Sequence, residues 1–407
     1  MKKILIISLI ILIISGSLGF IFYSKIKKTA QLPKQDQNGS INEASIRFIT
    51  PSGLKFEESK CLISDSISFK KYEDRQITEV PQKNLGYPNN KFGLYIYSTK
   101  DFIKTADALV NSNGGDWGYV LIPYNVKDYD DSKWKDVFEL LAKKHLIPVI
   151  QLWDVDPKEY KFQTRSSAKF LNKFAWPTKA KYISAYNEMN DSRFWNGDAN
   201  PEEYSDILKY TIESFKSEDE NFFVMNGAFN TTAPNGNGYI DQEAFMVRMN
   251  VRNPGIFDML DGWASHPYPQ PHYLGKPEDT GRGSIKGYEW ELELLKRRFE
   301  VKKDMPVFIT ETGWPHKEGE AGNANYYTSD IVAEYIKKAF VDVWLKDDRV
   351  VAVMPFTVYY DPPFDHFSWI KKDGGVYPQF DVIKALRKTA GRPPVLKEVE
   401  KELSTCD

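Results

Sequence analysis

The stretch Val307-Phe308-Ile309-Thr310-Glu311-Thr312-Gly313-Trp314-Pro315 decides how this chain is interpreted. Its first four residues are apolar or β-branched, as is typical of a short buried strand, and a glutamate then ends the run. A second stretch, Tyr182-Ile183-Ser184-Ala185-Tyr186-Asn187-Glu188, has the same order. Each stretch predicts a buried strand that carries a carboxylate at its carboxyl end.

Runs of the same kind recur from Phe92 onward, and segments of helical periodicity separate them. This alternation predicts parallel strands joined by crossover helices, and eight such strands close a (β/α)₈ barrel, the TIM-barrel form of the α/β class. The predicted strands are Phe92–Tyr97, Trp117–Pro123, Ile147–Trp153, Tyr182–Tyr186, Phe222–Ala228, Leu260–Ser265, Val307–Thr310 and Val350–Thr357.

The intervening segments carry helix signals of their own. Asn200-Pro201-Glu202-Glu203 predicts a helix start, with a capping side chain, a proline at the first helical position and acids in the first turn. Helical spacing of apolar residues is clearest at Trp134, Val137, Phe138 and Leu141, and again at Ile285, Tyr288, Leu292, Leu295 and Phe299. The alternative, an open doubly wound sheet, calls for a glycine-rich turn after the first strand, where Ser98-Thr99-Lys100 stands.

The amino-terminal region has a different composition. Ile4–Tyr23 is apolar over the ~20 residues that a membrane-spanning helix needs, and lysines flank it on both sides. We expect residues 1–28 to form an uncleaved signal anchor that holds the protein at the cell membrane in a single pass, with the barrel outside the cytoplasm. The alternative is a secreted protein, cleaved near Ser17-Leu18-Gly19.

The remaining organisation follows from composition. Residues 29–44 are polar and predict a linker, residues 45–90 contain short β-prone pieces and predict a strand-rich extension, and residues 91–392 form the predicted barrel before a tail at 393–407. The only two cysteines, Cys61 and Cys406, lie on either side of the barrel. They either pair as a disulfide or remain separate thiols, and the sequence leaves both open.

The net charge and the aromatic content of the chain indicate which classes of binding partner to expect. The formal net charge is -2, from 54 basic and 56 acidic residues without long runs of one sign, so a nucleic-acid partner is not expected. Aromatic residues make up 14% of the chain, including 10 Trp and 23 Tyr, which suits stacking against sugar rings.

The two strand-terminal glutamates carry the predicted chemistry. In a barrel of this kind the carboxyl ends of all strands meet at one face, where active sites lie, so Glu188 and Glu311 are expected to face each other. Hydrolysis of a glycoside with retention of configuration needs two carboxyl groups about 5–5.5 Å apart. The fourth and seventh predicted strands place the pair where this spacing is possible.

The motifs Asn187-Glu188 and Glu311-Thr312-Gly313-Trp314-Pro315 resemble those of the clan A glycoside hydrolases. The second is most similar to the motif of the plant-type β-1,3-glucanases, and cellulase-like and β-xylosidase-like families share the layout. The resemblance implies that Glu188 is the general acid/base, Glu311 the nucleophile and Asn187 a donor to the sugar 2-hydroxyl. It also implies, from Trp263-Ala264-Ser265-His266-Pro267-Tyr268, that Tyr268 hydrogen-bonds the nucleophile and His266 lines the cleft. Such a phenol would favour the ionised form of Glu311.

The chain departs from the family pattern in two places. Met189 follows Glu188 where the family has proline, and the second strand, Val120-Leu121-Ile122-Pro123-Tyr124, lacks the arginine that many members carry near the nucleophile. Lys127 and Lys317 are candidates to replace that positive charge. Four aromatic residues that follow strands are candidates for sugar stacking: Trp153, Trp314, Tyr359 and Trp369.

The expected function is that of a retaining glycoside hydrolase, without a metal or other cofactor, which cleaves β-linked poly- or oligosaccharides. A transglycosidase would use the same pair of glutamates, and a non-catalytic carbohydrate-binding barrel would not need them. A zinc hydrolase built on His266, His272 and His316 is a weak alternative, because no H-E-x-x-H motif or cysteine cluster accompanies these histidines.

Overall fold

The computed structural model describes residues 89–320 and 322–392, and within them all eight predicted strands are present. The predictions that fall on residues 1–88 and 393–407 lie outside the described residues: the anchor, the linker, nearly all of the strand-rich extension, the tail and both cysteines. The strands are β1 (Gly93–Tyr95), β2 (Gly118–Asn125), β3 (Leu146–Trp153), β4 (Lys181–Asn187), β5 (Phe222–Ala228), β6 (Trp263–Ser265), β7 (Val307–Ile309) and β8 (Val350–Val353).

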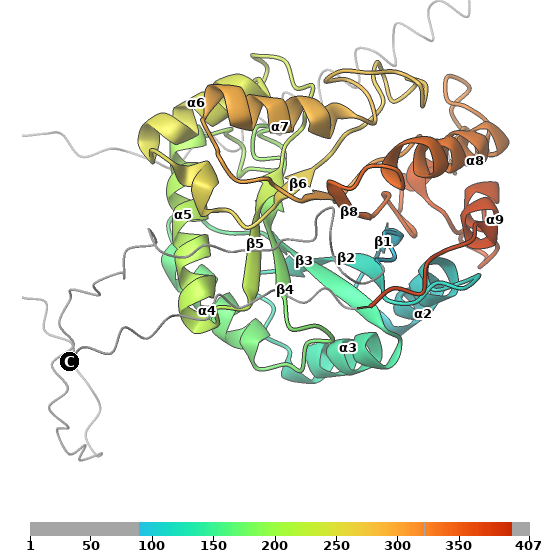
Figure 1. Cartoon of the computed structure of the whole chain (residues 1–407), viewed down its shortest axis with the longest axis horizontal. Coiled ribbons are helices and arrows are strands. Elements are labelled where there is room, and N and C mark those ends of the chain that lie inside the picture. Colours follow the sequence, from blue (N-terminus) through green and yellow to red (C-terminus); the bar gives the residue numbers. More distant parts are fainter. Residues whose placement is uncertain (1–88, 321, 393–407) are drawn as a thin grey trace, which may run out of the picture. The chain divides into compact units, whose positions relative to one another are not determined.

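The strands are all parallel and close on themselves (Figure 1). Continuous pairing joins β1 to β5 in order, and β6 to β8 in order. Parallel bridges between Phe92 and Val353 and between Met225 and Gly262 connect these two sheets at both seams. At the second seam the side chain of Asn226 replaces a backbone partner, since it accepts a hydrogen bond from the amide of Ala264 (2.9 Å) and donates to its carbonyl (3.0 Å).

Helices surround the strands, as Figure 1 shows; α2 to α8 each connect one strand to the next, and α9 follows β8. The predicted helix start at Asn200 is observed: its side chain accepts from the amide of Glu203, and Pro201 occupies the first turn. The main helices are α2 (Lys100–Val110), α3 (Asp131–Lys143), α4 (Tyr160–Asn172), α5 (Pro201–Glu218), α6 (Gln242–Arg252), α7 (Gly287–Arg298), α8 (Ser329–Lys338) and α9 (Pro378–Ala385).

Successive side chains of a strand point to opposite faces of the sheet, so the buried residues form two groups. One fills the inside of the barrel and includes Tyr119, Tyr182 and Phe308, whose rings meet at centroid distances of 5.1 and 6.3 Å. The other lies between strands and helices and includes the periodic residues predicted for α3, Trp134 and Leu141 among them. The barrel interior is therefore packed, and open space is found at its ends.

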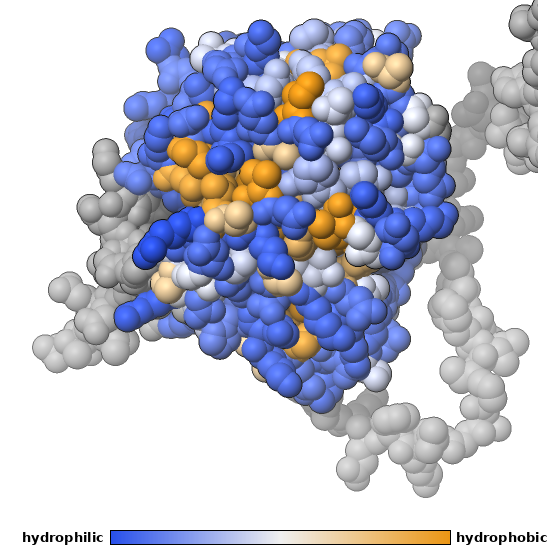
Figure 2. Space-filling model, turned by 90° about the vertical axis from the view of Figure 1, so that its right-hand side faces the viewer, coloured by the Kyte–Doolittle hydropathy of each residue, from blue (hydrophilic) through white to orange (hydrophobic). Residues whose placement is uncertain are grey.

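The surface shown in Figure 2, on the side of α8 and α9, is mostly hydrophilic, with hydrophobic residues in small separate groups. Within the described part of the chain, no helix has both the length and the apolar character needed to cross a membrane.

Candidate active site

A cavity of about 370 Å³ opens at the carboxyl ends of the strands. This volume is within the ~300–1,000 Å³ typical of small-molecule sites. Each of the eight strands contributes to the wall, either by its own residues (β1 to β4) or by the segment that follows it (β5 to β8). The lining residues are Tyr95, Tyr97, Pro123, Asn125, Trp153, Asp154, Asn187, Glu188, Arg193, Phe194, Asn230, Tyr268, Tyr273, Glu311, Phe356, Tyr360, Phe364 and Phe367.

The end of β4 turns sharply to direct Glu188 into this cavity. The hydroxyl of Tyr204, from α5, lies between β4 and β5, where it accepts from the amide of Gly227 (2.8 Å) and donates to the carbonyl of Ala185 (3.1 Å). A Cβ at Gly227 would lie 2.5 Å from that carbonyl oxygen, so glycine is needed here. Tyr186 and Glu188 adopt left-handed conformations, with φ of 79° and 40°. Such conformations cost about 1–3 kcal/mol each and concentrate at functional sites.

Glu311 lies two residues beyond β7, and the neighbouring β6 end holds its backbone. The amide of Thr310 donates to the carbonyl of Ser265 (3.0 Å), and the hydroxyl of Thr312 donates to the carbonyl of Pro267 (2.9 Å). Glu311 is only 8% exposed. These contacts fix the β7 end against the segment that carries His266 and Tyr268.

The structure brings Glu188, Glu311 and His266 together. One carboxylate oxygen of each glutamate and one ring nitrogen of His266 all lie within 4.8 Å of one another. His266 Nδ1 is 3.1 Å from Glu188 Oε1 and 3.7 Å from Glu311 Oε2. The phenol of Tyr268 donates to Glu311 Oε2 at 3.1 Å. The residues expected from the two glutamate motifs and from the sixth strand therefore form one cluster.

Burial and several of the neighbouring groups act on the pKa of Glu311 in opposite directions. Burial raises the pKa of Glu311 from its ordinary value of 4.5 to about 7, and the charge of Glu188 acts in the same direction. The charge of His266 and the Tyr268 hydrogen bond lower the pKa, but they do not outweigh burial. For His266, burial alone would lower the pKa, yet the charges of Glu311 and Glu188 raise it.

We predict that Glu311→Gln stabilises the fold at high pH. A raised carboxyl pKa gives stability that is present below the unfolded value of 4.5 and is lost as the pH rises through about 7. Calorimetric unfolding should give a gain on the order of 1–3 kcal/mol at about pH 8 and almost none at about pH 4. The exposed glutamate Glu278, whose side chain is 64% exposed, provides the control Glu278→Gln, which should give no gain at either pH. If Glu311→Gln lowered the free energy of unfolding by the same amount at both pH values, the predicted stabilisation at high pH would be wrong.

Asn187 is oriented by a residue that the sequence analysis missed. The indole of Trp153 can only donate, and it donates to Gln151 Oε1 (2.8 Å). Gln151 therefore presents its Nε2 to Asn187, whose Oδ1 accepts the bond (2.9 Å). The amide nitrogen of Asn187 is left to donate into the cavity. A glutamine inside an apolar strand run, 0% exposed in β3, is the signal that was available in the sequence.

Of the four aromatic candidates, Trp153 alone lines the cavity. Trp314 is 2% exposed and its indole donates to the carbonyl of Gly275 (2.7 Å), so it anchors a loop. Trp369 is 4% exposed, and Tyr359 bonds Asp361 outside the cavity. The aromatic wall next to Glu311 consists of residues not predicted: Tyr95, Tyr97, Phe356, Tyr360, Phe364 and Phe367.

The positive charge at the cavity comes from Arg193, in the loop after β4. Neither Lys127 nor Lys317, the candidates from the sequence, lines the cavity. Arg193 is held by two-fold pairing with Asp191, in which Nε (3.0 Å) and Nη2 (2.6 Å) reach the two carboxylate oxygens. Because this loop has no apolar periodicity, the sequence did not identify Arg193 as a residue of the site.

The histidines of the zinc alternative do not come together. His316 is buried and its Nε2 bonds the carbonyl oxygen of Ser368 at 3.0 Å, while His272 is exposed. Among the described residues, the group with metal-ligand geometry is Glu188, His266 and Glu311.

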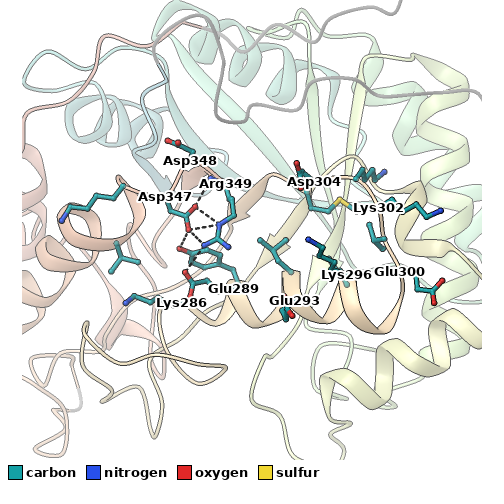
Figure 3. A pocket seen from close by; sticks show the side chains of 18 of the residues that line it. Lys286, Glu289, Glu293, Lys296, Glu300, Lys302, Asp304, Asp347, Asp348 and Arg349 are labelled. Carbon is teal, nitrogen blue, oxygen red and sulfur yellow. Dashed lines mark hydrogen bonds and ion pairs between the residues drawn. The ribbon is translucent and has the colours of Figure 1, made fainter.

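A larger hollow of about 1130 Å³ lies at the opposite end of the barrel, against residues that precede β7 and β8. Figure 3 shows side chains of both signs along it. Arg349 pairs there with Asp347 (2.6 Å) and Glu289 (3.0 Å). Because active sites of this fold lie at the carboxyl ends of the strands, the smaller cavity with the two glutamates is the candidate site.

No protein-family model and no curated protein sequence matches this chain. Among solved structures, a monomeric β-xylosidase from Caulobacter crescentus CB15 is 15% identical, with a TM-score of 0.53 over 73% of this chain and 68% of that chain. A GH39 β-xylosidase from Caulobacter crescentus is 16% identical, with a TM-score of 0.51 over 73% of this chain and 71% of that chain. The likeness of the chain to these glycoside hydrolases lies in the (β/α)₈ fold.

Proposed function

We propose that this protein is a retaining glycoside hydrolase that cleaves β-linked poly- or oligosaccharides by double displacement. The observation that carries the proposal is the pair of glutamates in one cavity, with carboxylate oxygens within 4.8 Å of each other. Retaining enzymes hold their carboxyl groups about 5–5.5 Å apart, whereas inverting enzymes need about 6.5–9.5 Å to admit a water molecule. The short separation therefore favours retention. The β-linkage follows from the resemblance of the Glu311 motif.

In the first step an oxygen of the ionised Glu311 attacks the anomeric carbon and forms a covalent bond to the sugar. The glycosidic bond breaks as the proton of Glu188 passes to the leaving oxygen. This step requires Glu188 to be protonated while Glu311 is ionised. The hydrogen bond from Tyr268 and the charge of His266 favour the ionised Glu311 against its burial.

In the second step Glu188, now ionised, accepts a proton from water, and the water oxygen attacks the anomeric carbon to release Glu311. The amide nitrogen of Asn187, directed by Gln151, can donate to the 2-hydroxyl of the bound sugar. Hydrogen bonds to that hydroxyl strengthen in the transition state. A transglycosidase would differ only in the acceptor for this step.

The proposal also includes a location. The apolar segment Ile4–Tyr23 supports a membrane anchor, and the barrel would then act on saccharides outside the cytoplasm.

An activity screen of the full chain tests the function. We expect release of reducing sugar or of an aryl alcohol from at least one of four substrate classes: β-glucans, mannans, xylans and aryl β-glycosides. Glu311→Gln is the matched inactive control. Chromatography of the products separates hydrolysis from transfer, since transfer yields longer saccharides. A wild-type rate no higher than that of the control on every substrate would contradict the proposal.

A further inference from the structure

The segment that follows β8 forms one wall of the cavity, and its lining residues are all aromatic. This β8 wall consists of Phe356, Tyr360, Phe364 and Phe367. The charged residues that line the cavity come from the segments at the ends of β3, β4 and β7, and they are Asp154, Glu188, Arg193 and Glu311. The β8 wall therefore offers apolar ring faces without a charge, which suits a neutral sugar ring.

Hydrogen bonds and ring contacts place the β8 wall next to Glu311. The amide of Phe356 donates to the carbonyl of Thr312, the residue after Glu311 (3.1 Å). Phe367 packs edge-on against Tyr268 (5.9 Å between ring centroids), and the Tyr268 phenol donates to Glu311 Oε2 (3.1 Å). Phe356 and Phe367 also contact each other (5.8 Å). The wall is thus continuous with the proposed nucleophile.

Phe364 is the ring of the β8 wall that lies nearest to solvent, since 37% of the residue is exposed. It contacts Tyr360 (5.6 Å) and Phe356 (6.3 Å) at nearly right angles, so neither of these rings lies flat on it. In the described part of the chain, no ring contact joins Phe364 directly to Tyr268; Phe356 and Phe367 link the two. Phe364 therefore stands at the mouth of the cavity.

The loop that carries Phe364 is held on both sides of this residue. The amide of Phe364 donates to the carbonyl of Asp361 (3.2 Å), and its carbonyl accepts from the amide of Phe367 (3.0 Å). Between them His366 is buried, and its Nδ1 donates to the carbonyl of His316 (2.8 Å). A ring that is fixed before a ligand arrives loses little freedom on binding.

Single exposed apolar residues are normal on protein surfaces, so exposure alone does not indicate a function. In residues 89–320 and 322–392 the large exposed ones are Tyr129, Phe162, Val251, Ile331, Val341 and Phe364. Of these, Phe364 alone lines the cavity that holds the two glutamates. Its position in an aromatic wall distinguishes it from the others.

We propose that Phe364 is a stacking platform for a second sugar ring, distinct from the ring whose anomeric carbon Glu311 attacks. The ring under attack lies at Glu311, whereas Phe364 is linked to the Tyr268–Glu311 pair only through two other rings of the wall. This inference rests on the proposed glycosidase function and assigns its substrate class, neutral saccharides of two or more rings. Phe364 acts here as a specificity-determining residue that favours longer substrates.

The test compares Phe364→Ala with the wild-type full chain on two substrates of the same sugar, an oligosaccharide and the glycosyl fluoride of the monosaccharide. The fluoride has no second ring to stack. We expect the ratio of kcat/KM for the oligosaccharide to kcat/KM for the fluoride to fall about tenfold, mainly through a higher KM. Phe364→Trp keeps an aromatic face and should keep the wild-type ratio. Phe162→Ala in α4 is the matched control, because Phe162 is 67% exposed and lies outside the cavity lining.

A binding measurement separates the platform from the function. In a Glu311→Gln background, titration calorimetry with β-glucan, mannan and xylan oligosaccharides should show about tenfold weaker binding once Phe364→Ala is added. An unchanged kcat/KM ratio with unchanged affinity, or an equal fall for both substrates, would overturn the platform while the glycosidase function stands. Weaker binding by a chain whose wild type cleaves neither substrate would overturn the function and keep the platform. A chain that neither cleaves nor binds these saccharides would overturn both.

Discussion

Replacing Glu311 by glutamine lowers turnover on every glycoside by on the order of 10⁴-fold or more, whatever the leaving group. Glutamine keeps the size of the side chain and its contact with Tyr268, but it cannot attack the anomeric carbon. Because the covalent intermediate no longer forms, a better leaving group does not help. Steady-state rates on one oligosaccharide and one dinitrophenyl glycoside measure this.

The surface substitution Glu278→Gln, at a side chain that is 64% exposed, is the control and should leave both rates unchanged. If Glu311→Gln kept the wild-type rate on the activated substrate alone, Glu311 would be the proton donor and the two roles would have to be exchanged.

Replacing Glu188 by alanine affects the two substrates unequally. The first step fails for the oligosaccharide, whose leaving group needs a proton, and a loss of about 10²–10⁴-fold is expected. The dinitrophenyl group leaves without protonation, so the glycosyl-enzyme still forms on Glu311. Its hydrolysis lacks a general base, and the intermediate accumulates. A rapid burst of dinitrophenol before a slow steady state is the expected kinetic signature.

Azide then restores turnover of the dinitrophenyl glycoside, because this anion attacks without a general base and the alanine leaves room for it. The product should be a glycosyl azide with the configuration of the substrate. A Glu188→Ala enzyme that loses both substrates equally, and that azide does not rescue, would contradict the role of Glu188 even though the barrel remains.

The sequence allows the architecture to be predicted because each strand is a short apolar run and each helix has its own period. All eight strands are found, and the helix start at Asn200 is observed to the residue. Strand ends are less accurate: β8 ends at Val353, whereas the predicted strand ran to Thr357. Beyond Val353 the backbone still bonds its neighbours, since the amide of Met354 donates to the carbonyl of Ile309 (2.8 Å) and the amide of Tyr95 donates to the carbonyl of Pro355 (3.1 Å). Phe356 then lines the cavity.

The candidate site was predictable where it depends on strand ends. Glu188, Glu311, His266 and Tyr268 all follow strands, so the fold alone brings them together. Aromatic residues after strands do not obey this rule, since the same ring can line the cavity or anchor a loop. Trp314 anchors the loop at Gly275. Tyr360 lines the cavity, whereas the predicted Tyr359 does not.

Residues from long loops could not be found in the sequence. Arg193 and Tyr273 owe their positions to a buried carboxylate and to strained backbone, neither of which leaves a periodic pattern. The raised pKa of Glu311 has the same origin, because burial depends on packing that no local motif encodes. Sequence motifs identify the proposed reacting groups, and tertiary contacts set the pKa of Glu311.

The most direct test of the account is to trap the covalent intermediate. A 2-deoxy-2-fluoro glycoside with a dinitrophenyl leaving group slows the second step more than the first, so the glycosyl-enzyme should accumulate in the wild-type protein. Peptide mapping by mass spectrometry is predicted to find one fluoro sugar attached to Glu311. Attachment to another residue, or turnover to a product of inverted configuration with no adduct on the protein, would contradict the double-displacement mechanism.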